Sequence, residues 1–303
     1  LAEVQDSEGI AQVGFFVKYY GLLESFTSSP YEYAWNTYGI IDGTYTLNVR
    51  AINLSGIQNS KSINVKVNNG QKTFGGSDYD VAHSIQQTTD GGYIVAGDTT
   101  SFGAGGYNVY ILKLNSDGNL AWQKTFGGSS DDAALSVQET TDGGYIVAGY
   151  TRFFGAGNDD VYIVKLNSDG SLAWQKTYGG IWNDEAYSIQ QTTDGGYIVA
   201  GYTESFGSGG YDAYILKLNS DGSLAWQKTF GGSDYDEAYS VQQTTDGGYI
   251  VGGYTYSFGF DNCDVYVLKL NSDGSLAWQK TFGGNGYDYA RSVKQTTDGG
   301  YIV

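Results

Sequence analysis

A unit of 52 residues recurs along most of this chain, and the repetition constrains the fold more than any other feature. The phrase QTTDGGYIVAG begins at Gln87, and near-copies begin at Glu139, Gln191, Gln243 and Gln295. A fixed period of this size is typical of proteins in which each repeat is one small structural unit that packs against its neighbours. The sequence therefore predicts an array of similar units.

Within a unit the apolar pattern has a period of two. In DAYILKL (212–218), Ala213 and Ile215 point to one face while Tyr214 and Leu216 point to the other, as in a β-strand. Asp-Gly pairs in TTDGG and LNSDG supply the positive φ of tight hairpin turns. No run shows helical spacing over three turns. Four strands per unit, joined by tight turns, predict the blades of a β-propeller.

The repeated residues also carry a family resemblance. The units resemble the TFGG…DGGYIVAG…KLNSDG…W propeller repeats of secreted and cell-surface proteins of archaea and bacteria, and they resemble kelch blades. The resemblance covers about residues 70–303. It implies a propeller fold and a surface location, but it implies no activity, because one fold hosts many functions.

The first 69 residues do not follow the period. The segment SPYEYAWNTYGIIDGTYTLNVRAINLSG resembles bacterial Ig-like modules. That resemblance implies a β-sandwich with a tyrosine corner at Asp42, Gly43 and Tyr45, a core aromatic at Trp35, and a missing first strand. We therefore expect an all-β chain: an Ig-like β-sandwich over 1–69, then a β-propeller over 70–303 with four complete repeats and a partial fifth.

Both ends of the repeat array are incomplete in sequence. QKTF at Gln71 corresponds to an outermost strand, and the fifth unit stops after its DGGYIV. Either a ring of about five blades closes with a defect, or the chain is a segment of a longer protein. We favour the second interpretation. If the chain is natural as it stands, an unpaired strand edge predicts head-to-tail assembly with copies of itself into a filament.

Composition excludes several classes of function. A net charge of −17 argues against nucleic acid and anionic lipid surfaces as partners, and no stretch is apolar enough for membrane insertion. One His (His83) and one Cys (Cys263) exclude the usual Ser-His-Asp and Cys-His nucleophile systems and His/Cys zinc sites. His83 recurs in no other unit and is interpreted as an ordinary variable position. No cofactor is expected, with calcium left as a possibility.

Three residue types recur at fixed places. The lysines (Lys113, Lys165, Lys217 and Lys269) are expected to end strands or to pair with the recurring carboxylates. The tryptophans (Trp122, Trp174, Trp226 and Trp278) are expected to pack between blades rather than to stack on sugars. One class of aspartates lies just before each first strand: Asp80, Asp132, Asp184, Asp236 and Asp288.

These aspartates have two interpretations. Asp ahead of a strand commonly accepts hydrogen bonds from loop N–H groups. Asp-rich loops also offer the oxygen ligands that calcium prefers, although no unit contains a full EF-hand series. The five residues are therefore candidate calcium ligands.

Loops that differ between units are the expected place for recognition. Ile181 and Trp182 replace small polar residues of the sister units. Phe153, Phe206 and Phe258 belong to a second variable loop around a recurring Phe-Gly. These five residues are the candidate binding surface.

The residues favour a non-catalytic extracellular or cell-surface module that binds surface proteins, glycans or copies of itself. The alternative is a polysaccharide hydrolase or lyase that uses Asp and Glu carboxylates, which the composition cannot exclude. Convergence of several carboxylates with aromatic residues in one place would favour the alternative, and an even spread around the ring would oppose it.

Overall fold

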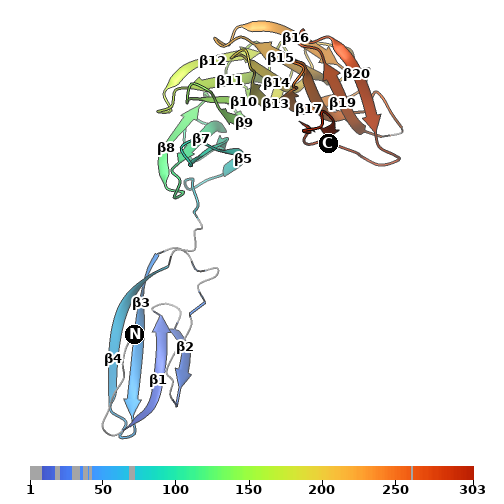
Figure 1. The fold of residues 1–303 in the computed structure, drawn as a ribbon. Helices are drawn as coiled ribbons and strands as arrows, with labels where there is room; N and C mark the ends of the chain where they lie inside the picture. Colours follow the sequence, from blue (N-terminus) through green and yellow to red (C-terminus); the bar gives the residue numbers. More distant parts are fainter. Residues whose placement is uncertain are drawn as a thin grey trace. The chain divides into compact units, whose positions relative to one another are not determined.

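The computed structural model describes residues 9–17, 21–28, 35–36, 40, 43–67, 72–260 and 262–303. The chain divides into two compact units, Leu1–Thr73 and Phe74–Val303. All regular elements of the described residues are β-strands (Figure 1), so the expected all-β class is confirmed. Within these residues there is no helix of the length and hydrophobicity needed to cross a membrane.

The described part of the first unit forms one antiparallel sheet with strand order β2–β1–β3–β4. Its strands are β1 (Ile10–Val17), β2 (Gly21–Phe26), β3 (Gly43–Asn53) and β4 (Gln58–Val67). Trp35 meets Tyr45 of β3 edge to face, with ring centroids 5.7 Å apart. Asp42 of the expected tyrosine corner lies outside the described residues.

The second unit is built from four-stranded antiparallel sheets, one per repeat, in which consecutive strands are neighbours. The first blade contains β5 (Asp80–Gln87), β6 (Tyr93–Thr99), β7 (Asn108–Leu114) and β8 (Leu120–Phe126). The second contains β9 (Asp132–Glu139), β10 (Tyr145–Thr151), β11 (Asp160–Leu166) and β12 (Leu172–Tyr178). The third contains β13 (Asp184–Gln191), β14 (Tyr197–Thr203), β15 (Asp212–Leu218) and β16 (Leu224–Phe230).

The fourth blade contains β17 (Asp236–Gln243), β18 (Tyr249–Thr255), β19 (Asp264–Leu270) and β20 (Leu276–Phe282). The short strands β21 (Lys294–Gln295) and β22 (Tyr301–Ile302) pair in the fifth repeat. The blades lie side by side along an arc, as Figure 1 shows.

The hydrophobic core of this unit lies between blades. One cluster joins Ile146 and Ile163 of the second blade to Ile189 and Tyr214 of the third. Trp122 in β8 meets Tyr145 of the next blade at 5.7 Å, and the other recurring tryptophans repeat this contact. The expected packing of the tryptophans between blades is confirmed. Each blade needs its neighbour because both of its faces are apolar.

The repeated TTDGG phrase is a turn that binds a buried lysine. In the third blade, the Thr192 hydroxyl and the Gly196 N–H donate to Asp194, and Lys217 lies 2.9 Å from the same carboxylate. Gly195 has a φ of +81°, and a Cβ on Gly196 would lie 2.2 Å from the Leu218 carbonyl oxygen, so this turn requires glycine at both positions.

The recurring lysines therefore pair with aspartates of the TTDGG turns, which were not among the candidate residues of the sequence. The partners are Asp90, Asp142, Asp194 and Asp246. In the fourth blade, the Thr244 hydroxyl and the Lys269 ammonium hold the pKa of Asp246 at about 2.

Side-chain hydrogen bonds also join successive first strands, which lie next to one another. Gln138 Oε1 accepts from the backbone N–H of Gln191 at 2.6 Å, and Gln191 Oε1 accepts from the N–H of Thr141 at 2.8 Å. Ser136 Oγ accepts from Ile189 N–H at 3.2 Å. The Gln and Thr of the repeated phrase thus connect blades in both directions.

We expect Gln138→Leu to lower the free energy of unfolding by about 1–2 kcal/mol, because the Gln191 N–H loses its acceptor. Gln138→Glu keeps an acceptor oxygen and should cost less. Urea unfolding followed by circular dichroism measures both variants. A leucine variant as stable as the parent protein would contradict this role for the side chain.

Candidate binding face

The first strand of each blade has a β-bulge at the same place. The register shifts between Ala186 and Ser188 in β13, and between Ala238 and Ser240 in β17. The other two blades repeat the shift. A bulge removes one residue from the ladder and re-aims its side chain. The residues displaced in this way are His83, Leu135, Tyr187 and Tyr239.

The bulge residues of the third and fourth blades stack on one another. Tyr187 and Tyr239 lie with ring centroids 4.9 Å apart and planes 25° apart. Arg291, at the equivalent position of the fifth repeat, places its guanidinium carbon 4.2 Å from the Tyr239 ring centroid. This position, interpreted from the sequence as an ordinary variable one, therefore brings side chains of the third, fourth and fifth repeats into contact.

These tyrosines belong to a larger group that we call the tyrosine cluster. Each ring contacts the next, with centroid separations from 4.5 to 6.3 Å, and the series closes on itself. In order of contact its members are Tyr187, Tyr202, Tyr211, Tyr235, Tyr256, Tyr254 and Tyr239. Tilted and edge-to-face contacts of this kind stabilise aromatic groups beyond their buried area.

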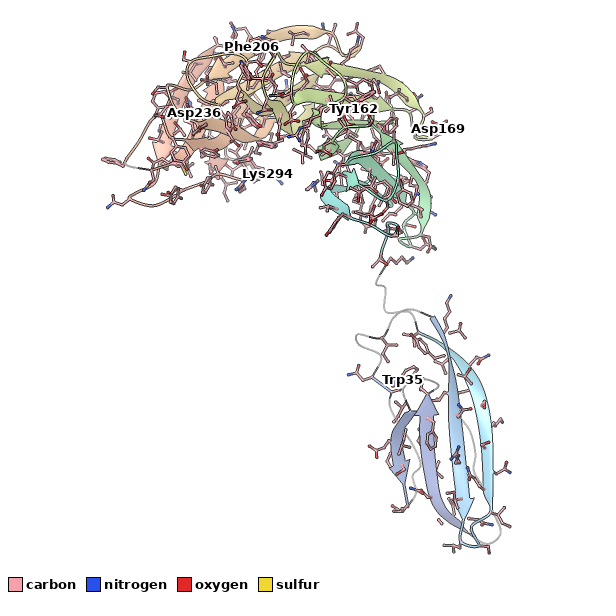
Figure 2. The ribbon with its side chains drawn as sticks, turned by 180° about the vertical axis from the view of Figure 1, so that it is seen from behind. Trp35, Tyr162, Asp169, Phe206, Asp236 and Lys294 are labelled. Carbon is pink, nitrogen blue, oxygen red and sulfur yellow. The ribbon has the colours of Figure 1, made fainter. Side chains whose placement is uncertain are left out.

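The cluster lies on one side of the third and fourth blades. Its residues come from the beginnings of β13 and β17, the ends of β14 and β18, and the loops beside them. We call this side, where first strands begin and second strands end, the loop face. Phe206 and Asp236, labelled in Figure 2, mark it. Asp169, also labelled, lies in the turn between β11 and β12 at the other end of the strands.

The first two blades have polar side-chain contacts where the cluster has rings. Arg152, equivalent to Tyr256, pairs with Asp159 at 2.6 Å and with Asp131 at 3.2 Å. In the first blade His83 Nε2 lies 2.5 Å from Asp98 Oδ1. The tyrosine cluster is therefore confined to the third and fourth blades and is not a feature of every repeat.

Two glutamates lie within the tyrosine cluster. Tyr202 donates to Glu185 Oε1 at 2.9 Å, and Tyr254 donates to Glu237 Oε1 at 2.7 Å. Burial raises the pKa of Glu185 to about 7 against the lowering effect of the Tyr202 hydrogen bond, and the negative charges of Asp159 and Glu237 act with burial. The cluster thus combines aromatic rings with two carboxyl groups, and the charge of Glu185 is costly to bury.

The loop face exposes aromatic area around the cluster. Tyr235 is 50% exposed, and the predicted surface residues Trp182 and Ile181 are 54% and 67% exposed. Exposed tyrosine and tryptophan side chains are frequent anchors of binding interfaces. The tyrosines themselves were not among the sequence candidates, because Tyr187 and Tyr239 meet only when neighbouring blades pack.

The predicted phenylalanines differ in their surroundings. Phe206 packs on Tyr214 and Phe258 on Tyr266, each at 5.7 Å. Phe154, not Phe153, is their counterpart in the second blade. Phe153 takes the place of a serine that elsewhere donates to the Asp before the first strand, and it is 50% exposed.

The candidate calcium ligands accept loop hydrogen bonds, and all but Asp288 are the first residue of a blade's first strand. Asp236 Oδ2 accepts from Gly232 N–H at 2.8 Å and from the Ser257 hydroxyl at 2.6 Å. The members Asp80, Asp132, Asp184 and Asp288 accept from the equivalent glycine N–H. No three His, Cys, Asp or Glu side chains of the described ranges are grouped to hold a metal ion.

The second carboxylate oxygen of three of these aspartates is buried and has no hydrogen-bond partner within the described chain. The three are Asp132, Asp184 and Asp236. Calcium at this class of aspartates stays a prediction.

Family models match both parts of the chain. Residues 1–49 match a bacterial Ig domain, and residues 88–120, 140–172, 192–224 and 244–276 match a beta-propeller domain of unknown function, DUF5122. Both resemblances stated from the sequence are therefore confirmed. Tyr187, Tyr235 and Tyr239 lie outside the matched segments.

A curated relative is the regulatory protein FlaEY of Caulobacter vibrioides, 24% identical over 159 residues. The match covers 44% of this chain and only 17% of that protein.

Two solved structures show weak similarity. One is the extracellular domain of a protein described as a hybrid two component system from B. thetaiotaomicron, with 14% identity and a TM-score of 0.40 over 83% of this chain and 30% of that one. The other is a eukaryotic initiation factor, with 10% identity and a TM-score of 0.33 over 90% of this chain and 83% of that one. Neither TM-score is high enough to establish a shared fold.

Ionisation of Glu185 should destabilise the propeller. The raised pKa means that its favourable contribution is fully present below the unfolded value of 4.5 and is lost as pH rises through about 7. Between about pH 5 and pH 8 we expect the parent protein to lose about 2 kcal/mol more unfolding free energy than Glu185→Gln. Parallel pH profiles of the two proteins in urea unfolding would show that the carboxyl is not buried as described.

If calcium binds at the candidate ligands Asp80, Asp132, Asp184, Asp236 and Asp288, we expect the melting temperature of the protein to be higher in calcium than after chelation. Asp236→Asn, which keeps an acceptor for Gly232 N–H, should then reduce the calcium-dependent shift. Differential scanning calorimetry with and without chelator measures it. An unchanged melting temperature would show that calcium does not bind at these aspartates.

Proposed function

We propose that this chain is a non-catalytic binding module of an extracellular or cell-surface protein, and that it binds through the loop face of its third and fourth blades. The tyrosine cluster with its exposed rim is the observation that supports this most. Tyrosine supplies a large, rigid contact area at low entropic cost. Confinement of the cluster to one sector fits recognition, because scaffolding residues recur in every blade.

The domain composition supports the proposed location. A bacterial Ig domain joined to propeller repeats is typical of extracellular and surface proteins. We propose other surface proteins, glycans or copies of the chain itself as partners. Nucleic acid does not fit, because a net charge of −17 would repel it.

One observation favours the second candidate, a polysaccharide hydrolase or lyase. Glu185 and Glu237 converge with tyrosines, and a carboxyl with a pKa near 7 can act as a general acid. Against it, both glutamates accept tyrosine hydrogen bonds, and Glu237 is only 6% exposed. Release of reducing or unsaturated sugar ends from polysaccharides, abolished in Glu185→Gln, would establish the enzyme.

Removing an exposed ring from the loop face should weaken binding. We expect Trp182→Ala and Tyr235→Ala each to reduce affinity about tenfold for whatever ligand glycan and peptide arrays identify. Leu172→Ala is the matched control, since Leu172 is 45% exposed at the other end of the strands. Equal affinities of all three variants would place binding elsewhere.

A further inference from the structure

We propose that the partner of the loop face is a protein that places a lysine or arginine side chain in the tyrosine cluster beside Glu185. This inference rests on the proposed function and names the chemistry of its ligand. It is carried by a cation already bound within the molecule, by the orientation of the rings, and by the charges around them.

The molecule itself shows the mode of binding. The Arg291 guanidinium carbon lies 4.2 Å from the ring centroid of Tyr239 and 5.3 Å from that of Tyr289. Both separations are within the range of cation–π attraction. Within the described part of the propeller, no Lys or Arg stacks in this way on Tyr211, Tyr235 or Tyr256. Tyr235 and Tyr256 are 50% and 37% exposed, so a cation from outside can reach these two rings.

The rings form walls rather than a flat platform. Tyr235 meets Tyr211 at an interplanar angle of 65° and Tyr256 at 83°. Rings at steep angles to one another can present a face and an edge to the same cation, as the rings of aromatic cages do. A sugar ring instead stacks on one flat, exposed face. The geometry therefore favours a cationic side chain over a glycan.

Negative charge surrounds these rings. Burial raises the pKa of Tyr211, and the charges of Glu204, Glu237 and Glu185 raise it further, so the phenol lies in a negative potential. The nearby cation Arg152 is already paired with Asp159 and Asp131. The net charge of −17 also attracts a basic partner and speeds its association.

A cation beside Glu185 should make binding depend on pH. The groups that face this carboxyl are Asp159, Glu237 and the four tyrosines Tyr150, Tyr187, Tyr202 and Tyr211. Burial and the Glu185 charge raise the pKa of all four tyrosines, which therefore stay neutral near pH 7. A bound cation favours ionised Glu185, so affinity should rise as pH increases through about 7.

The test uses a hexa-arginine peptide as probe, with hexa-glutamate and a neutral cello-oligosaccharide for comparison, in isothermal titration calorimetry of the whole chain. At about pH 8 and roughly 0.15 M salt we expect Glu185→Gln to weaken hexa-arginine binding about tenfold. Asp169→Asn removes one charge at the far end of the strands and should change affinity less than about twofold. The increase of affinity with pH should disappear in Glu185→Gln.

Tyr256→Thr provides a second variant in case Glu185→Gln does not fold. It copies Thr100, the residue of the first repeat, at a position that is 37% exposed, and it should also weaken the peptide about tenfold. Equal effects of Glu185→Gln and Asp169→Asn would show unspecific attraction and overturn the inference.

The outcomes also separate the inference from the proposed function. Binding of the oligosaccharide but not of the peptide, sensitive to Tyr235→Ala, would overturn the cationic partner and keep the loop face as a binding site. If the loop-face variants changed the affinity for neither probe and for no array ligand, both the inference and the proposed function would fail.

Discussion

The propeller depends on burial of apolar surface between blades. A single four-stranded sheet with two apolar faces is not stable in water, and here Ile146 and Ile163 of one blade find their partners in Ile189 and Tyr214 of the next. This requirement explains the near-identical strands of successive repeats. One face of each blade packs against the preceding blade and the other face packs against the following blade. Every blade therefore needs the same pair of complementary apolar faces.

Polar side chains then set the register of this packing. Gln138 and Gln191 bridge backbone groups of adjacent blades, and the TTDGG turn satisfies a buried lysine that would otherwise be an unpaired charge. These residues account for the repeated phrase without any ligand. What remains for recognition is the small set of positions at which the repeats differ.

The sequence predicted the strands, the turns and the blade repeat, because these follow from alternation and Asp-Gly pairs within one unit. It also placed Ile181 and Trp182 correctly in a variable, exposed loop. It did not predict the tyrosine cluster, because Tyr187 and Tyr239 become neighbours only through packing between blades. Phe153 was assigned wrongly, since the 52-residue period aligns Phe154 with Phe206 and Phe258, and the packing of Phe154 on Tyr162 agrees with that alignment. The signal that was missed is the changing residue between a constant Ala and a constant Ser.

That changing residue sits on the bulge, outside the ladder of backbone hydrogen bonds. A side chain there contributes little to strand pairing, which is why histidine, leucine and tyrosine occupy equivalent places in blades of the same shape. The bulge therefore separates the evolution of specificity from the evolution of folding. Duplication of one unit copies the four-stranded fold together with one position that strand pairing does not restrict. Each added blade therefore adds one more variable side chain to the surface of the array.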